Sequence, residues 1–332
     1  MKYGIYFPPG RHLDRRTESG QKKDLMLLEY LDKLGFDYAW FAESRLEERQ
    51  TDPTHEEFIS IATKRTHKIK IGIGVAQPNS KNIQSLANQV MHLSNINKSR
   101  VVFGAGPGFL GAESSNIGIN NDQFDSMVKS IKAVKSLSNI GSISEKSIRF
   151  SLSPNKPENN SFSAIEFAVA SHSSPIAAVL AGTFGLGMLS LGAFTAGGFS
   201  NLSSIWEIYQ RKAKANGYND DRSRWSLAVP MHLAKSQGDA QHDVRFGSDQ
   251  WIRELQTNRA CLSPKLGNGA KQIIENGLGV IGTPKDAINK IRELEQKSGG
   301  FGCILLAAHQ WADIEATKQS YKIFRDYVIN VI

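Results

Sequence analysis

A short stretch near the middle of the chain carries one imidazole and three hydroxyl groups within four residues. It reads Ala170-Ser171-His172-Ser173-Ser174-Pro175 and follows an apolar run, Ile165–Ala170, that predicts a β-strand. Pro175 is typical of the first residue of a helix. The hydroxyls therefore fall at a helix N-terminus, where free N–H groups and serine side chains bind an anion such as a phosphate. The alternative is simple capping of the helix by Ser174.

Two other predicted strands also end in groups that can do chemistry. The run Gly35–Ala42 is apolar and aromatic almost throughout and is followed by Glu43, Ser44 and Arg45. His309 follows the run Gly302–Ala308 in the same way. Such continuous apolar strands are typical of parallel sheets covered on both faces, and their C-terminal ends carry the active sites of α/β folds. His309 is therefore a candidate site residue, with a satisfied structural histidine as the alternative.

Glycines mark the ends of two more predicted strands. Gly74 and Val75 lie at the end of Lys70–Ala76, and Gly104 and Gly106 end the strand that begins at Arg100. A residue without a side chain lets a flat ligand approach the backbone closely. The alternatives are that Gly74 relieves crowding inside a barrel and that the other two only punctuate a loop.

Several classes of site are disfavoured. The histidines other than His172 and His309 share no spacing with acidic residues that would indicate a metal. The two cysteines, Cys261 and Cys303, provide neither a disulfide framework nor a multi-cysteine metal site. The net charge of +8 is spread along the chain, and its local cluster at residues 64–70 lacks interleaved aromatic residues. It therefore predicts a solvated surface and not a nucleic-acid site.

The elements that must position these groups alternate regularly between strand and helix. Predicted strands cover residues 1–7, 36–42, 70–76, 100–104, 165–170, 187–191, 225–234 and 302–308. Predicted helices cover residues 24–34, 54–66, 83–93, 121–138, 175–183, 202–216, 240–253, 283–295 and 313–328. This alternation predicts an α/β protein with a (β/α)8 TIM barrel. An open dinucleotide-binding sheet would want a glycine-rich turn after the first strand, where this chain has Pro8-Pro9-Gly10.

Length and composition fit one soluble globular domain. The 332 residues are 40% hydrophobic and 22% charged, and we expect a single domain over residues 1–332. Two irregular excursions, at about 139–163 and 254–279, are expected over the C-terminal mouth of the barrel. The uncharged stretch 176–194 is long enough to suggest a membrane span, but four glycines divide it into a helix, a turn and a strand. The start of the chain resembles a first strand and not a signal peptide, so we expect a cytoplasmic location.

Several motifs, in order along nearly the whole chain, carry a family resemblance. They are Tyr3-Gly4-Ile5, Gly35 to Glu43, Gly72-Ile73-Gly74-Val75, Arg100 to Gly108, Val169-Ala170-Ser171, Asp221 to Trp225, Val280-Ile281-Gly282-Thr283-Pro284, Ser298 to Gly302 and Ala307 to Asp313. With these residues the chain resembles bacterial luciferase-like flavin monooxygenases, and within them the limonene 1,2-monooxygenase group.

The resemblance implies a TIM barrel, often dimeric, whose mouth binds reduced flavin supplied by a separate reductase. The flavin reacts with O2 to form a C4a-hydroperoxide that oxygenates a small, apolar organic substrate, while the protein orients the flavin and excludes water. FMN is expected in preference to FAD. The resemblance places the flavin phosphate at the segment Ala170 to Ser174, which includes His172. It places the flavin ring against Gly74 and Val75 and beside the turn that contains Gly104 and Gly106.

The chain departs from the family pattern at three places. Many members have Glu-His-His after strand two, with the first histidine acting as acid and base, whereas this chain has Glu43-Ser44-Arg45. A histidine is usual after strand three, where Pro78-Asn79-Ser80-Lys81-Asn82 stands, and a phosphate-binding arginine aligns with Pro107. Serine cannot exchange a proton near neutral pH as histidine does. Either His172 or His309 supplies the imidazole, or the reaction needs none, or catalysis is impaired.

Two rival functions follow from these departures. One is hydride transfer with the deazaflavin F420, which would show as anaerobic reduction of bound cofactor by a substrate alcohol. The other is a flavin-binding or partner subunit without turnover of its own.

Overall fold

The computed structural model describes most of the chain. The described residues are 1–8, 18–42, 55–76, 93, 100–106, 125, 127–129, 131–132, 166–257 and 269–332.

Eight parallel strands close into a ring at the centre of the molecule. They are β1 (Lys2–Phe7), β2 (Tyr38–Phe41), β3 (Lys70–Ala76), β4 (Val101–Ala105), β5 (Glu166–Ser171), β6 (Gly187–Ser190), β7 (Trp225–Leu233) and β9 (Cys303–Ala307). Each strand pairs with the next, β9 pairs with β1, and β7 pairs with β6 and with β9, which closes the circle. The predicted TIM barrel is confirmed, and all eight predicted strands form it.

One strand was not predicted. The short strand β8 (Val280–Gly282) pairs with Met231 to Leu233 of β7, beyond the point where β7 pairs with β9. Residues 254–279 were predicted to be irregular. Instead, residues 254–257 continue the helix that precedes them, and residues 270–275 form another helix. The prediction of an irregular zone is therefore wrong for residues 254–257 and 270–275, whereas residues 276–279 form turns and bends. The excursion predicted at 139–163 lies outside the described residues.

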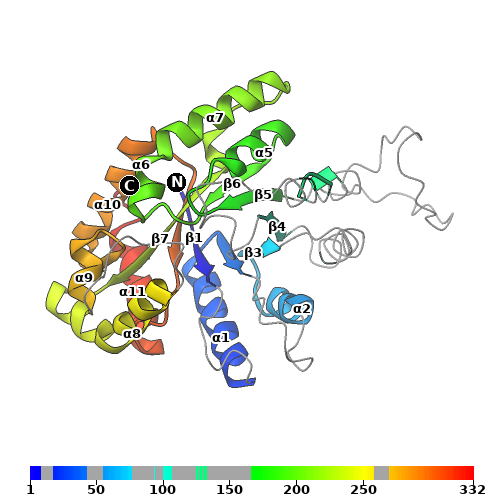
Figure 1. Cartoon of the computed structure of the whole chain (residues 1–332). Helices are drawn as coiled ribbons and strands as arrows, with labels where there is room; N and C mark the ends of the chain where they lie inside the picture. The colour runs from blue at the N-terminus through cyan, green and yellow to red at the C-terminus, as the bar shows by residue number, and fades with distance from the viewer. Residues whose placement is uncertain are drawn as a thin grey trace.

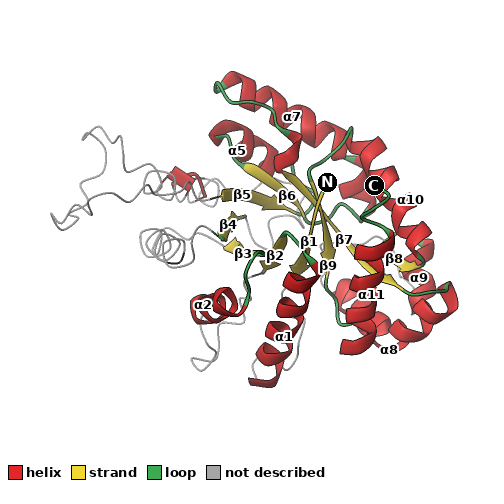
Figure 2. Cartoon of the chain, turned by 180° about the vertical axis from the view of Figure 1, so that it is seen from behind, coloured by secondary structure: helices red, strands yellow, loops and turns green. Residues whose placement is uncertain are grey.

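Helices surround the ring of strands (Figures 1 and 2). In order they are α1 (Glu18–Leu34), α2 (His55–Arg65), α5 (Ile176–Phe184), α6 (Ala196–Ser200), α7 (Leu202–Ala215), α8 (Gln237–Thr257), α9 (Ala270–Glu275), α10 (Pro284–Ser298) and α11 (Ile314–Tyr327), with a single 3-10 turn at Arg222–Arg224. In Figure 1, α8 to α11 group on one side of the strands and α5 lies beside α7.

Local sequence explains where several helices begin and end. Thr283 and Asp286 form a capping box at the start of α10, and Gly299 ends that helix in the left-handed conformation. Asp313 accepts hydrogen bonds from the N–H groups of Glu315 and Ala316 at the start of α11. The stretch 176–194 divides at Gly185 into α5 and β6, and no helix in the described part of the chain is long and apolar enough to cross a membrane.

Successive side chains of each strand point to opposite faces, so the strands contribute to two separate apolar clusters. On β2, Ala39 and Phe41 belong to the large cluster between the strands and the helices, while Tyr38 and Trp40 belong to a smaller cluster built from alternate strand residues. The smaller cluster fills the barrel interior. It contains Tyr6, Tyr38, Trp40, Ala42, Val102, Ala168, Ala170, Leu189, Leu191, Ala228, Cys303, Leu305 and Ala307. Strand two is apolar throughout because both of its faces are buried.

Large and small residues are complementary across this interior. The Trp40 indole packs against Gly72 and Gly74 of the neighbouring strand, and a Cβ atom at Gly72 would lie 2.3 Å from Trp40 Cε3. A Cβ at Gly74 would lie 2.8 Å from the same atom. Both distances are below any normal contact, so the glycines are required by the bulk of Trp40.

This packing makes a testable prediction about stability. Changing Gly72 to Ala should lower the free energy of unfolding by about 1 to 3 kcal/mol, because overpacking forces the indole or the backbone to shift. The matched control is Gly197→Ala, since a Cβ at Gly197 in α6 meets no atom within 4 Å. Urea unfolding of both variants measures the difference, and equal stability of the two would contradict the proposed crowding.

Candidate active site at the barrel mouth

His172 lies at the C-terminal end of β5, on the rim of the barrel. It directly follows Ser171, the last residue of that strand. Its carbonyl accepts a hydrogen bond from Gly192 N at 3.1 Å, and its ring lies edge-on to Phe194 with the centroids 6.0 Å apart. A Cβ on Gly192 would lie 2.7 Å from the imidazole Cδ2, so the ring packs directly on the loop after β6.

Burial changes the charge state of this histidine. Desolvation lowers the pKa of His172 from 6.5 to about 4. The imidazole is therefore neutral at physiological pH, and it acts there as a hydrogen-bonding group and not as a charged acid.

The serines around His172 form a local hydrogen-bonded turn. Ser171 Oγ donates to the carbonyl of Ser174 at 2.9 Å, and Ser171 is buried. Ser174 Oγ accepts from Ile176 N at 3.3 Å, at the start of α5. Capping by Ser174, the alternative to anion binding, is therefore present. The two functions are compatible, because a hydroxyl that accepts one bond can still donate its own proton to a phosphate.

The helix after this turn begins one residue later than predicted. Pro175 occupies the N-cap position of α5 and not the first helical position. The N–H groups of the first turn still point back toward the rim of the barrel, as at any helix N-terminus.

The predicted glycines lie together on adjacent strands. A Cβ built on Gly74 would lie 3.6 Å from the Cα of Gly104, and Gly106 is buried just after β4. The contact of Gly74 with Trp40 supports the crowding explanation for this glycine. A flavin contact at Gly74, Gly104 and Gly106 stays a prediction. Val75 is part of β3, and its side chain lies outside the described residues.

His309 lies just after β9 with its ring among tryptophans. Its N–H donates to the carbonyl of Ala307 at 3.1 Å, a tight turn that ends the strand. Its ring centroid is 4.7 Å from that of Trp251 and 5.6 Å from that of Trp311. The two indoles also contact each other, 5.1 Å apart in an edge-to-face arrangement.

An aromatic row joins the two histidines. Trp251 of α8 contacts His309 on one side and Phe194 on the other, where the centroids are 6.1 Å apart, and Phe194 contacts His172. The sequence analysis missed Phe194 and Trp251 as site residues. Trp251 lies in a predicted helix at apolar spacing, where an aromatic residue is indistinguishable from ordinary core.

Several other positions named in the sequence analysis are not among the described residues. Glu43 and Ser44, the candidates after β2, lie outside the described residues, as do Pro107 and residues 78–82. Within the described part of the chain, no group of three or more His, Cys, Asp or Glu residues is arranged to hold a metal ion.

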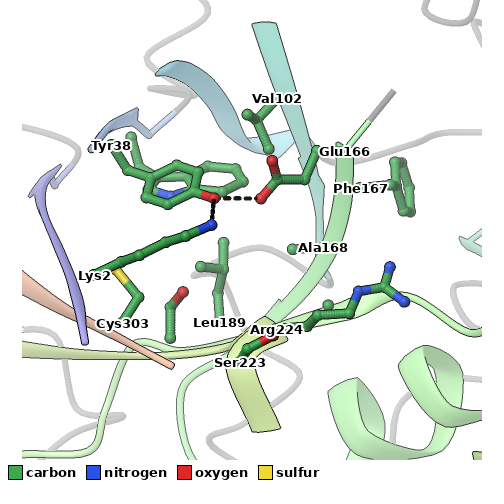
Figure 3. A pocket seen from close by; sticks show the side chains of 13 residues that line it. Lys2, Tyr38, Val102, Glu166, Phe167, Ala168, Leu189, Ser223, Arg224 and Cys303 are labelled. Atoms are coloured by element: carbon green, nitrogen blue, oxygen red, sulfur yellow. Dashed lines mark hydrogen bonds between the residues drawn. The ribbon is translucent and has the colours of Figure 1, made fainter. Parts of the chain in front are cut away.

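A cavity of about 220 Å³ opens at the opposite, N-terminal end of the barrel (Figure 3). Trp40, Val102 and Leu189 line it from inside the barrel, and Lys2 and Glu166 line its opening. Tyr38 links these two charged groups, because Lys2 Nζ donates to its hydroxyl at 3.1 Å and that hydroxyl donates to Glu166 at 2.7 Å.

The Glu166 carboxylate at this cavity is paired with a lysine. Lys70 Nζ lies 2.5 Å from Glu166 Oε2. Burial raises the pKa of Glu166, but the hydrogen bonds from Lys70 and Tyr38 outweigh that effect and leave the pKa lowered. Residues at the N-terminal face of a TIM barrel usually serve stability. We therefore place the candidate active site at the C-terminal mouth, with His172 and His309.

Comparison with known proteins identifies the family. The family described as luciferase-like monooxygenase matches residues 1–300. The limonene 1,2-monooxygenase of Rhodococcus erythropolis is 31% identical over 333 aligned residues, which cover 99% of this chain and 86% of that protein. The chain belongs to the luciferase-like monooxygenase family, and the predicted resemblance is confirmed.

Solved structures show the same fold. The oxygenating constituent of 3,6-diketocamphane monooxygenase from Pseudomonas putida, in complex with FMN, superposes with a TM-score of 0.74 at 20% identity, covering 100% of this chain and 99% of that one. An F420-dependent secondary alcohol dehydrogenase superposes with a TM-score of 0.70 at 16% identity, covering 100% and 99%. At these identities the likeness concerns the fold, which hosts both kinds of cofactor.

The low pKa of His172 predicts how stability depends on pH. The unfolded chain binds the histidine proton more readily than the folded chain between pH 6.5 and about 4. Its contribution to stability is therefore complete above pH 6.5 and is lost as the pH falls toward 4, by up to about 3 kcal/mol. Urea unfolding at several pH values should show a smaller loss for His172→Gln than for the unchanged protein.

The control for this measurement is His242→Gln, at an exposed position on α8. This variant should keep the pH dependence of the unchanged protein. If His172→Gln also keeps it, the imidazole of His172 is not the group that is buried uncharged.

Proposed function

We propose that this chain is a flavin-dependent monooxygenase that uses reduced flavin and O2 to oxygenate a small, apolar organic substrate. The observation that carries the proposal is the convergence of His172, the start of α5 and His309 at the mouth of a luciferase-like barrel. The family match and the monooxygenases among its relatives support it. When bound, the reduced flavin supplies the chemistry that activates O2.

The residues at the start of α5 fit an FMN phosphate. Ser173 and Ser174 present hydroxyls beside the first N–H groups of the helix, and the neutral His172 adds no charge of its own. Ser171 has a different part, because its hydroxyl closes the turn onto Ser174. We therefore assign phosphate binding to Ser173, Ser174 and the helix N–H groups, and a supporting role to Ser171.

Buried aromatic rings pack against the two histidines. Phe194 contacts His172, and Trp251 and Trp311 contact His309, all three within the large cluster between the strands and the helices. We propose that this apolar packing keeps water away from the histidines and suits a small, apolar substrate.

Of the two imidazoles, we assign proton exchange to His309, because burial keeps His172 neutral. Glu43 and Ser44 stay candidates for polar contacts with the reacting groups. We further propose a separate flavin reductase as partner, a homodimer as the working form and a cytoplasmic location.

Hydride transfer with F420 is the second candidate function. It is favoured by the F420-dependent alcohol dehydrogenase among the structural neighbours. The third is a flavin-binding subunit without turnover, which is motivated by Ser44 standing where related proteins have histidine.

One set of measurements separates these functions. Purified protein is titrated with FMN, FAD and F420 and followed by the absorbance of each cofactor, with FMN expected to bind most tightly. Oxygen uptake with reduced FMN and formation of an oxygenated product from a limonene-type terpene support the proposal. Anaerobic reduction of bound F420 by a secondary alcohol would favour the second function. Tight flavin binding without an O2-dependent product would favour the third.

The assignment of the phosphate site predicts a selective loss of affinity. The double variant Ser173→Ala with Ser174→Ala should weaken FMN binding by about tenfold or more, because hydrogen bonds to a charged group contribute about 1.5 to 3 kcal/mol each. Riboflavin, which lacks the phosphate, should bind nearly as before.

Fluorescence titration with FMN and riboflavin measures both affinities. Ser203→Ala is the control, because this hydroxyl bonds to the carbonyl of Lys297 on the outer side of the barrel. Equal losses for FMN and riboflavin in the double variant would refute the assignment.

A further inference from the structure

The His309 imidazole lies between two indole rings. The planes of His309 and Trp311 are nearly parallel, at 24°, and Trp251 contacts the imidazole at 47°. Contacts at centroid distances of 4.7 and 5.6 Å leave the imidazole little freedom to rotate. A histidine at the end of a strand is thus fixed by rings from a helix and from its own loop.

Trp251 is the central member of this arrangement. It is 5% exposed and reaches from α8 to the ends of β6 and β9. It contacts Trp311 and His309 on one side and Phe194 on the other.

The indole of Trp311 carries a buried polar atom. The Nε1 atom of Trp311 is buried and has no hydrogen-bond partner among the described residues. A buried donor without an acceptor costs about 1 to 3 kcal/mol, so the indole is retained there despite this cost.

A second tryptophan stack among the described residues, around Trp206, has a different hydrogen-bonding pattern. Trp206 stacks on Trp225 and Tyr209 and carries the Arg222 guanidinium on its face, and Trp225 Nε1 donates to Ser190. Both stacks belong to the large cluster between the strands and the helices. They differ because Trp225 Nε1 is paired, whereas Trp311 Nε1 is not paired among the described residues and its stack includes an imidazole just after β9.

We propose that Trp251, with Trp311 as the second face, is a positioning residue that holds the His309 imidazole in one orientation toward the barrel mouth. This proposal rests on the proposed function for the use of that imidazole, but not for the geometry of the clamp. The ring orientation decides which nitrogen atom faces a bound molecule, and displacements of about 1 Å can cost a hundredfold in rate.

The first test needs no cofactor. Proton NMR of the unchanged protein should show the His309 ring protons displaced upfield by the two indoles, with the signals assigned by their loss in His309→Gln. Trp251→Leu should remove most of that displacement, and Trp251→Phe should retain part of it because a ring remains. The control is Trp206→Leu, which removes an equally buried tryptophan (4% exposed) from the other stack.

The second test measures the consequence for function. With reduced FMN, O2 and a limonene-type terpene, Trp251→Leu should lower the rate of formation of the oxygenated product by about tenfold or more, Trp251→Phe should recover most of the rate, and Trp206→Leu should leave the rate unchanged. FMN affinity should be equal in all of them.

The two tests separate the clamp on His309 from the proposed function. Unchanged His309 signals in Trp251→Leu, or an equal change in Trp206→Leu, would overturn the clamp. If Trp251→Leu fails to fold, the same comparison is made with Trp251→Phe, whose His309 signals must move for the proposal to hold. A displacement that is lost in Trp251→Leu, together with no oxygenated product from the unchanged protein, would retain the clamp and reject the proposed function instead.

Discussion

The structure depends on how one large side chain fills a ring of eight parallel strands. Trp40 occupies the barrel interior beside Gly72 and Gly74, whose missing side chains make the space that the indole fills. A TIM barrel is a packed core and not a pore, so volume added on one strand must be removed on its neighbour. Gly74, which the sequence suggested as a ligand contact, therefore serves first to let strand β3 pack against β2.

The same closure brings distant parts of the chain to one rim. β5 and β9 are separated by more than a hundred residues, yet their C-terminal ends place His172 and His309 at the same end of the barrel. The two histidines differ in environment: burial keeps His172 neutral, while His309 lies between two indoles. At the other end of the barrel, Glu166 is paired with Lys70 and hydrogen-bonded by Tyr38, which is consistent with a structural role.

Much of the fold was predictable because its signals are local. A parallel strand covered on both faces is apolar throughout, so Tyr38 to Phe41 could be recognised without knowledge of its partners. The cap residues Thr283 and Asp313 likewise mark helix starts within a few positions. Strand β8 was missed because its three residues are too short for a pattern, and it is held by pairing with the end of β7. Helix α9, in a stretch rich in glycine and polar residues, was missed for the same reason.

The sequence alone determined the barrel, the family and the candidates His172 and His309, since each follows from a run of neighbouring residues. It left open whether Gly74 faces a ligand or a bulky neighbour, and whether Ser174 caps a helix. Only the tertiary structure decided that Trp40 crowds Gly74, that Ser171 closes the turn, and that Trp251 joins the two histidines. These contacts join residues far apart in the chain, and a contact between distant residues leaves no periodic or local signal.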